Sequence, residues 1–542
     1  MSNNNNMQPI YILPEDTKRT TGKDAQRNNI LAAKAVAQAV RTTLGPKGMD
    51  KMIVDSFGNV IVTNDGVTIL KEMHIEHPAA KMVVEVAKTQ ESAVGDGTTT
   101  AVIIAGELLK KAEELLDQNI HPTSLTKGFR LAEQKAQEVL SKLAQKVTPN
   151  DKDILAKVAI TAMTGKGAET NKEELSNLLV KALNHLIQSN SNLSDLSNDD
   201  IKVELHIGSS ANQSYLVEGV VISKERVHSA MPTKITEGAI ALLDYPIEIK
   251  NTEIDAKIQI TDPSQLNAFL DQEERTLQAI VSKIKESGAN VVFCQRGIDD
   301  LAQHFLAKSG ILALRRVKKS DMEALAKATS AKIVSSWKDL QSQDLGYAGF
   351  VHQEKVGSEE MVFVERCKNS KVVTLLLKAT TQHVGEEVKR AVVDAIGDLI
   401  ATIKDGFVVA GAGAVEMELS KELHQYAANL SSREQLAVIA FAQAMEIIPR
   451  TLAENAGMDP LDFITKLRTA HDQKQKWAGV NVFTGEVMDA WQEGVIEPLK
   501  IKTQALSSAV EVAQMILRID DVILGSTDKR ASYPSPSSTL DM

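Results

Sequence analysis

The sequence predicts a multidomain protein in which two mainly helical ends enclose an α/β module. At 542 residues the chain is long enough for roughly three or four domains. Helical periodicity dominates up to about residue 147, apart from one hairpin, and returns after Gly411. Between about residues 218 and 367, strand-like and helical segments alternate in the manner of a parallel sheet with crossover helices.

The composition is that of a globular protein and excludes several classes. The formal net charge of -10 argues against nucleic acid as the main partner. Two cysteines, Cys294 and Cys367, have no metal-ligand spacing, which indicates a reducing compartment. No stretch approaches 18 consecutive apolar residues, and the richest, 436–448, is interrupted by polar residues. We therefore expect a cytoplasmic protein with no membrane partner.

The two ends of the chain differ from the rest. Residues 1–8 are rich in Asn and lack the apolar region of a signal peptide. Residues 527–542 are rich in Ser and Pro, which predicts a disordered tail.

The first predicted helix runs from about Ile30 to Leu44 and must end at Gly45 and Pro46, a glycine followed by a residue that cannot continue it. Lys47 therefore lies on a tight loop. Residues 52–54 and 60–62 predict two short strands, and a polar turn at Asp65 follows them. Taken alone, this lysine is typical of a solvated loop and this aspartate of a turn.

The central motif is the run from Gly95 to Thr100, followed by an amphipathic helix from about Thr98 to Leu116. The free N–H groups of its first turn suit phosphate oxygens, and the carboxylate of Asp96 suits Mg2+. The motif alone is also typical of a glycine-rich turn with a capping threonine. Three such polar turns within about fifty residues favour one convergent site.

Two later segments carry charged groups. Lys166 lies between two glycines, on a loop that can move a charge. Asp394 lies on a predicted helix at 384–404, together with Glu387 and Asp398 on the polar face. The pattern alone describes both Lys166 and Asp394 as solvated.

A long helix is predicted inside the α/β module, with Asp262 and Gln265 as a capping box and an apolar stripe that ends at Gly288. About two dozen helical residues span roughly 36 Å, which is long for one small domain. From Leu277 onward the stripe is also typical of a core helix. The remaining apolar residues are candidates for contact with a neighbouring subunit or a client: Leu266, Phe269 and Leu270.

Six segments together resemble the nucleotide site and flanking regions of the chaperonins. The resemblance covers about residues 20–524 and is closest to the group II branch, the TCP-1/thermosome family, and within it to the archaeal subunits. The segments are Leu44–Met49, Thr63–Thr68, Gly95–Thr100, Thr164–Gly167, Gly411–Ala414 and Leu517–Asp521.

This resemblance implies the chaperonin fold: a mainly α equatorial domain, a small α/β intermediate domain and an α/β apical domain with a helical protrusion that serves as a lid. The implied boundaries are 1–147 and 408–526 for the equatorial domain, 148–217 and 368–407 for the intermediate domain, 218–367 for the apical domain, and about 245–285 for the protrusion.

The resemblance also implies the residues of an ATP and Mg2+ site. Asp65 and Asp394 would position and deprotonate the attacking water, Lys166 would sense the terminal phosphate, and Asp96 would bind the metal. Nucleotide-binding positions are Leu44, Gly45, Pro46, Lys47, Gly97, Thr98, Thr99, Thr100, Gly165, Gly411, Gly413 and Gln492.

Two positions depart from the family pattern. Ala412 replaces the middle glycine of a three-glycine segment, which is tolerable only if its backbone dihedrals are ordinary. Gln492 stands where an acidic residue commonly meets the nucleotide, so we expect weaker or less selective binding.

The resemblance implies an ATPase that folds non-native proteins inside a double ring of about sixteen subunits, alone or with related chains. One alternative is a catalytically weak structural subunit of a mixed ring, against which the retained acids and Lys166 argue. A second alternative is a small metabolic enzyme that uses ATP, which leaves the long protrusion unexplained.

Overall fold

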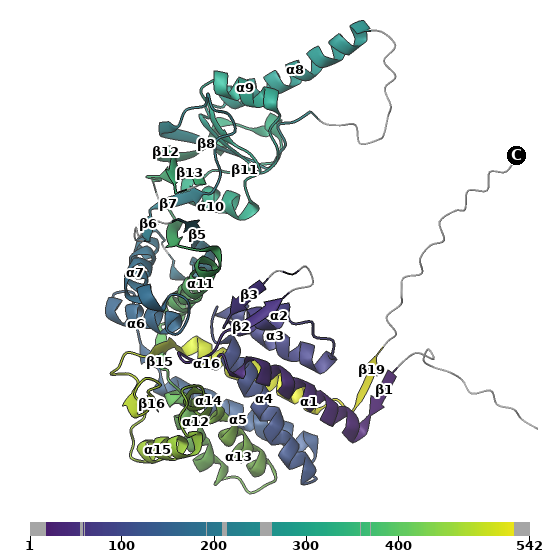
Figure 1. Ribbon diagram of the computed structural model, residues 1–542, viewed down its shortest axis with the longest axis vertical. Helices are drawn as coiled ribbons and strands as arrows, with labels where there is room; N and C mark the ends of the chain where they lie inside the picture. Colours follow the sequence, from purple (N-terminus) through teal and green to yellow (C-terminus); the bar gives the residue numbers. More distant parts are fainter. Residues whose placement is uncertain are drawn as a thin grey trace, which may run out of the picture.

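The chain forms three parts that follow one another along an elongated, curved molecule (Figure 1). The computed structural model describes residues 18–54, 58, 60–190, 192–208, 214–249, 263–357, 359–368 and 370–524. Several predictions fall outside these described residues: those on residues 1–8 and 527–542, most of the 55–59 turn, and Asp262 of the capping box. The side chains of Leu266, Phe269 and Leu270 lie outside the description as well.

The first part, which we call the equatorial part, is built around one hydrophobic core drawn from residues 30–143 and 409–517. Its N-terminal elements are β1 (Lys18–Thr21), α1 (Gly22–Arg41), β2 (Lys51–Val54), β3 (Val60–Thr63), α2 (Gly66–Glu72), α3 (Pro78–Ala93), α4 (Thr98–Asp117), α5 (Pro122–Leu143) and β4 (Gln145–Lys146). Its C-terminal elements are β15 (Phe407–Ala410), α12 (Ala414–Ala427), α13 (Glu434–Met445), α14 (Ile447–Asn455), α15 (Pro460–Asp472), β16 (Ala478–Val480), β17 (Val487–Asp489), β18 (Ile496–Pro498), α16 (Leu499–Leu517) and β19 (Asp521–Leu524).

The two ends of the described chain meet in the equatorial part. Strand β1 pairs antiparallel with β19, so that Lys18 lies opposite Leu524 (Figure 1). Among the described residues, one run, Glu434–Asn455, has the length and composition of a membrane span, but 78% of its apolar window is buried inside the protein. It spans α13 and α14, which are core helices of this part.

The second part, the intermediate part, has a core drawn mainly from residues 147–203 and 373–408. Helices α6 (Lys152–Met163), α7 (Lys172–Ser189) and α11 (Gln382–Asp405) accompany a three-stranded sheet of order β5 (Ile201–Ile207), β14 (Val373–Ala379) and β6 (Tyr215–Val217). Helix α11 is present as predicted and buries Val392, Ala395 and Leu399 in this core.

The third part, the apical part, holds a seven-stranded mixed sheet of order β10-β9-β8-β12-β13-β7, with β11 also paired to β8. The strands are β7 (Gly219–Ile222), β8 (Lys234–Leu243), β9 (Val291–Cys294), β10 (Leu312–Leu314), β11 (Ile333–Val334), β12 (Gly346–Val356) and β13 (Glu359–Glu365). The helices are α8 (Pro263–Glu286), α9 (Asp300–Lys308) and α10 (Lys319–Thr329).

The predicted parallel strands are confirmed, because β9 and β11 both run parallel to β8 and β10 parallel to β9. The antiparallel half of the sheet, formed by β12, β13 and β7, was not predicted.

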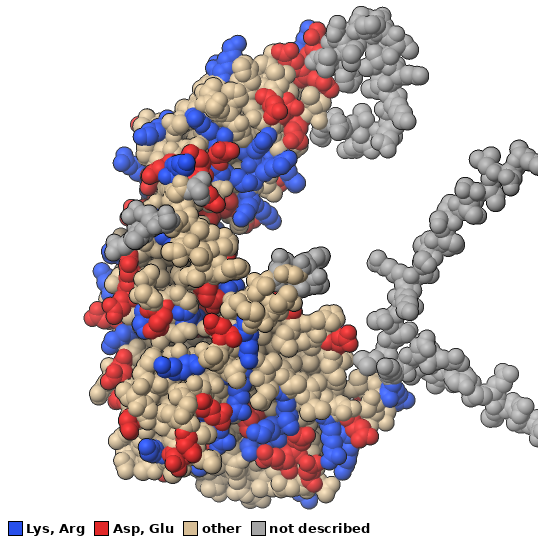
Figure 2. Space-filling model, viewed as in Figure 1, with Lys and Arg blue, Asp and Glu red and all other residues tan. Residues whose placement is uncertain are grey.

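Helix α8 has two different halves. From Leu277 onward its apolar side chains are buried in the apical core, so the stripe there is that of a core helix, as the pattern allowed. The N-terminal half projects beyond the sheet at the far end of the molecule (Figure 1). On the face that Figure 2 shows, acidic and basic side chains are interspersed over all three parts.

Candidate functional site

A cavity of about 400 Å³ lies where the equatorial and intermediate parts meet. Twelve of the predicted site residues line it: Leu44, Gly45, Pro46, Asp65, Asp96, Gly97, Thr98, Thr99, Thr100, Gly165, Lys166 and Gly413. Four do not: Lys47, Asp394, Gly411 and Gln492. The three polar turns of the N-terminal region therefore converge, as predicted.

Glycines allow the turns to approach closely. Gly97 has φ +79° and precedes Thr98, the first residue of α4. Gly165 has φ +77°, and a Cβ placed on it would lie 2.4 Å from the Cα of Pro46. The intermediate loop thus touches the equatorial loop directly, which brings Lys166 to the cavity.

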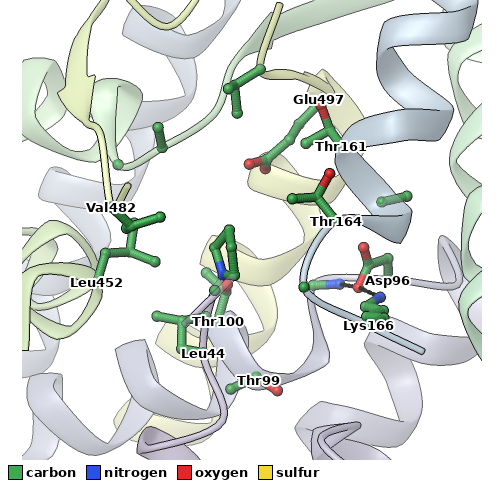
Figure 3. Close-up of a pocket in the computed structure, with 18 of the residues that line it drawn as sticks. Leu44, Asp96, Thr99, Thr100, Thr161, Thr164, Lys166, Leu452, Val482 and Glu497 are labelled. Atoms are coloured by element: carbon green, nitrogen blue, oxygen red, sulfur yellow. Dashed lines mark hydrogen bonds and ion pairs between the residues drawn. The ribbon is translucent and has the colours of Figure 1, made fainter. Parts of the chain in front are cut away.

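Lys166 joins two carboxylates that come from different parts of the molecule. Its Nζ lies 3.4 Å from Asp96 Oδ1, in the turn before α4 (Figure 3). The same Nζ lies 2.7 Å from Asp394 Oδ2, on α11. Burial favours the neutral amine, but Asp394 and Asp96 outweigh it and raise the pKa of Lys166 above its ordinary value. The lysine is therefore charged and bridges the two parts.

Asp394 is shielded rather than solvated, contrary to what the helical pattern alone indicated. Its side chain is 18% exposed and lies behind Lys166. Burial raises the pKa of Asp394 above its ordinary value, although Lys166 opposes that change. The polar face of α11 turns toward the cavity because the intermediate part folds over the equatorial turns.

Asp65 both lines the cavity and caps α2. Its Oδ2 accepts hydrogen bonds from the Thr68 backbone N–H at 2.9 Å and from Thr68 Oγ1 at 2.6 Å. These bonds hold the carboxylate in one orientation at the edge of the cavity.

Three acidic residues that line the cavity were not predicted as site residues: Asp398, Glu493 and Glu497. Asp398, one turn after Asp394 on α11, is 2% exposed, and its burial and the charge of Asp96 raise the pKa of Asp398 well above its ordinary value. Glu497 lines the cavity, and its carboxylate forms an ion pair with Lys502, whose Nζ lies 2.6 Å away. The same Nζ lies 2.9 Å from the carboxylate of Glu416. The spacing of Asp394 and Asp398, four residues apart on one helix, could have signalled the first of these.

Three predicted residues lie beside the cavity instead of lining it. Gly411 leaves room for a carboxylate, because a Cβ there would lie 2.3 Å from Glu497 Oε1. The ammonium of Lys47 lies 5.4 Å from the ring centroid of Phe483, a cation–π contact. Gln492 is exposed, and its neighbour Glu493 lines the cavity in its place.

The cavity has a polar end and an apolar end. Asp96 and Lys166 mark the polar end, and Leu44, Leu452 and Val482 lie on the opposite side (Figure 3). An apolar wall suits the flat aromatic base of a nucleotide, whereas the backbone N–H groups at the start of α4 suit its phosphates. The described residues contain no group of three or more His, Cys, Asp and Glu arranged to hold a metal. The carboxylate of Asp96, beside the donors at the start of α4, suits Mg2+, because this ion commonly binds one or two carboxylates together with substrate phosphates.

The backbone dihedrals of Ala412 are not ordinary, so this residue is strained. It has φ +55°, in the left-handed region, and it lines the cavity. An L-residue with a Cβ costs about 1–2 kcal/mol in this conformation, whereas glycine does not.

We expect Ala412→Gly to raise the free energy of unfolding by about 0.5–1 kcal/mol, the relief of strain minus the added entropy of the unfolded chain. Urea titration measures it. Ala35→Gly, at an exposed position within α1, is the matched control and should instead lower stability by about 1 kcal/mol. Equal losses in both variants would contradict the strain at Ala412.

Comparison with known proteins agrees with this geometry. The sequence pattern of the TCP-1/cpn60 chaperonin family matches residues 36–527. A thermosome subunit of Methanothermococcus thermolithotrophicus is 58% identical over 517 residues, which cover 95% of this chain and 94% of the relative. The thermosome subunit beta of Methanothermobacter thermautotrophicus is 58% identical over 520 residues, which cover 96% of this chain and 95% of the relative.

A solved structure is similar as well. The open-state monomer of a group II chaperonin from Methanococcoides burtonii matches with a TM-score of 0.60 and 44% identity, over 79% of this chain and 100% of that one. The chain belongs to the TCP-1/cpn60 chaperonin family. It is an ATP-dependent chaperonin subunit of the archaeal group II type, and the catalytically weak structural subunit is not favoured.

Proposed function

We propose that this chain hydrolyses Mg2+-bound ATP in the cavity and uses that reaction to fold non-native proteins in the cytoplasm. The observation that carries this proposal is the bridge of Lys166 between Asp394 and Asp96, because it joins a candidate base to a candidate metal ligand across two parts of the chain. The main hydrophobic clusters of the described residues fall within the equatorial, intermediate and apical parts, which supports the domain boundaries implied by the family resemblance.

In this proposal the chain's own groups position the substrate. The backbone N–H groups and hydroxyls of Thr98, Thr99 and Thr100 donate to phosphate oxygens at the start of α4. The ammonium of Lys166 attracts the terminal phosphate. Asp96 would hold Mg2+, which would supply positive charge to the phosphate groups when bound.

The chemical step is transfer of the terminal phosphoryl group to water. The water oxygen forms a bond to the γ-phosphorus, the bond from that phosphorus to the β–γ bridging oxygen breaks, and Asp394 accepts the proton that the water loses. Asp65, fixed by Thr68, orients this water. Since Asp394 and Asp96 lie on different parts, hydrolysis depends on how closely these parts approach.

The raised pKa of Asp394 predicts that kcat for ATP hydrolysis depends on pH in a range where an ordinary aspartate would not titrate. A base works only when deprotonated, so kcat should fall as the pH decreases through a range well above the ordinary aspartate value of about 4. Measurement of kcat at saturating ATP from pH 5 to 9 tests this expectation. A kcat that stays constant down to pH 5 would contradict it.

The native mass of the purified chain in Mg2+ and ATP tests the assembly. A double ring of about sixteen 58.9 kDa subunits has a mass near 940 kDa. A species of one or two subunits that hydrolyses ATP only with a discrete small-molecule acceptor would instead favour the metabolic-enzyme alternative.

A further inference from the structure

Asp398 is an acidic side chain of the cavity that the proposed reaction does not use. It lies on α11 one helical turn after Asp394, and it lines the cavity together with Asp96. Asp398 is 2% exposed, and among the described residues no hydrogen-bond donor reaches its Oδ1.

The backbone brings Asp398 to the turn that carries Asp96. Gly397 packs against that turn so closely that a Cβ on it would lie 2.6 Å from the Val94 carbonyl oxygen. A Cβ on Gly95 would lie 3.2 Å from the Cα of Gly397. The residues after these two glycines, Asp96 and Asp398, therefore face the same end of the cavity.

The lysines that line the cavity have other partners. Lys166 pairs with Asp394 and Asp96, Lys172 lies 2.7 Å from Glu169, and Lys502 lies between Glu416 and Glu497. Asp398 thus has no ion pair within the described part of the chain.

Four carboxylates surround the polar end, from Asp65, Asp96, Asp394 and Asp398, against the single ammonium of Lys166. A buried carboxylate without a partner costs several kcal/mol when it is ionised. The arrangement lacks positive charge, and a nucleotide adds further negative charge at the same place. A divalent cation held near Asp96 and Asp398 would supply the missing charge.

We propose that Asp398 is a second carboxylate for the divalent cation that Asp96 binds with the nucleotide phosphates, either directly or through a water on the cation. This assignment rests on the proposed function, because the cation enters with the nucleotide. Mg2+ commonly takes one or two carboxylates in such sites, so the donor set is chemically suitable.

Binding of Mn2+ in place of Mg2+ tests the assignment without any turnover. The full-length chain is saturated with the non-hydrolysable analogue AMP-PNP, and free Mn2+ is followed by its electron paramagnetic resonance signal. We compare the unaltered chain with Asp398→Asn, with Asp96→Asn, and with Asp405→Asn, a control at an exposed position on the same helix.

Asp398→Asn should weaken Mn2+ binding about tenfold or more, Asp96→Asn at least as much, and Asp405→Asn not at all. Binding of the analogue without metal should not weaken in Asp398→Asn, because a negative charge near the phosphates is removed. This second result separates a loss of metal binding from a general loss of the site.

Suppose that Asp96→Asn loses Mn2+ affinity but Asp398→Asn binds Mn2+ within twofold of the unaltered chain. This result would overturn the assignment of Asp398 but not the proposed function, and it would leave Asp398 as a buried neutral acid. Absence of any Mn2+–nucleotide binding by the unaltered chain would overturn the proposed function and this assignment together. If Asp398→Asn fails to fold, anomalous scattering from Mn2+ in crystals of the unaltered chain decides. A peak within about 4.5 Å of the Asp398 carboxylate supports the proposal, and a more distant one overturns it.

Discussion

Asp394→Asn is expected to lower kcat for ATP hydrolysis about 10³-fold, within the range of about 10²–10⁴ that a general base contributes. Asparagine keeps the shape of the side chain and can still accept from Lys166, which lies 2.7 Å from Asp394 Oδ2. It cannot accept a proton from water. The loss should therefore lie in the chemical step, and the affinity for the nucleotide should change only a few-fold.

Single-turnover hydrolysis measures the chemical step, and equilibrium binding of AMP-PNP measures affinity. Asp405→Asn, on an exposed position of the same helix, serves as the control and should hydrolyse ATP at the original rate. An Asp394→Asn chain that kept more than a tenth of the rate would exclude Asp394 as the base.

Lys502→Met is expected to lower the free energy of unfolding of the equatorial part by about 3–5 kcal/mol, the usual cost of breaking a buried ion pair from one side. The lysine side chain is 8% exposed, and it separates Glu416, at 2.9 Å, from Glu497, at 2.6 Å. Without it, two carboxylates remain close together in the interior.

Urea titration followed by tryptophan fluorescence measures this loss, because Trp477 and Trp491 stack at 5.8 Å within the equatorial part. Trp337→Phe removes the apical signal from every chain compared. Lys500→Met, two residues earlier on α16 and exposed, should change stability by no more than about 0.5 kcal/mol.

Removal of the two orphaned charges offers a further check on this cluster. The triple variant Lys502→Met, Glu416→Gln, Glu497→Gln should recover part of the lost stability, because unpaired buried charges cost more than neutral amides. A loss below 1 kcal/mol in Lys502→Met alone would show that the cluster is well hydrated.

Much of the site could be predicted because its turns are built from local chemistry. Gly45 and Gly97 both adopt positive φ, and the helix that follows Gly97 begins at Thr98 as its apolar spacing indicates. Glycine turns and helix starts depend on neighbouring residues, so they can be recognised in a single sequence.

The remaining features depend on contacts between distant segments. Periodicity showed that Asp394 and Asp398 share the polar face of a helix, but not that this face meets a cavity instead of water. The burial of that face follows from the approach of Gly397 to Val94, about three hundred residues away in the chain.

The place of Gln492 outside the cavity lining has the same cause, because it depends on contacts between distant segments. Gln492 was chosen by its place in a motif, whereas the cavity is lined by Glu493, in the turn before β18, and by Glu497, on β18 itself. Lys47 likewise lies on the predicted loop, but its ammonium contacts Phe483 from a distant loop. Neither side-chain direction can be read from the local sequence.

Recovery of a chemically unfolded client enzyme tests the central claim most directly, which is that hydrolysis at the Asp96, Lys166 and Asp394 site drives folding. The client is diluted into the assembled chain with Mg2+ and ATP, and its activity is followed. We predict a gain in recovered activity with the unaltered chain and no gain with Asp394→Asn. Equal recovery with and without ATP, or equal recovery by both chains, would contradict the account.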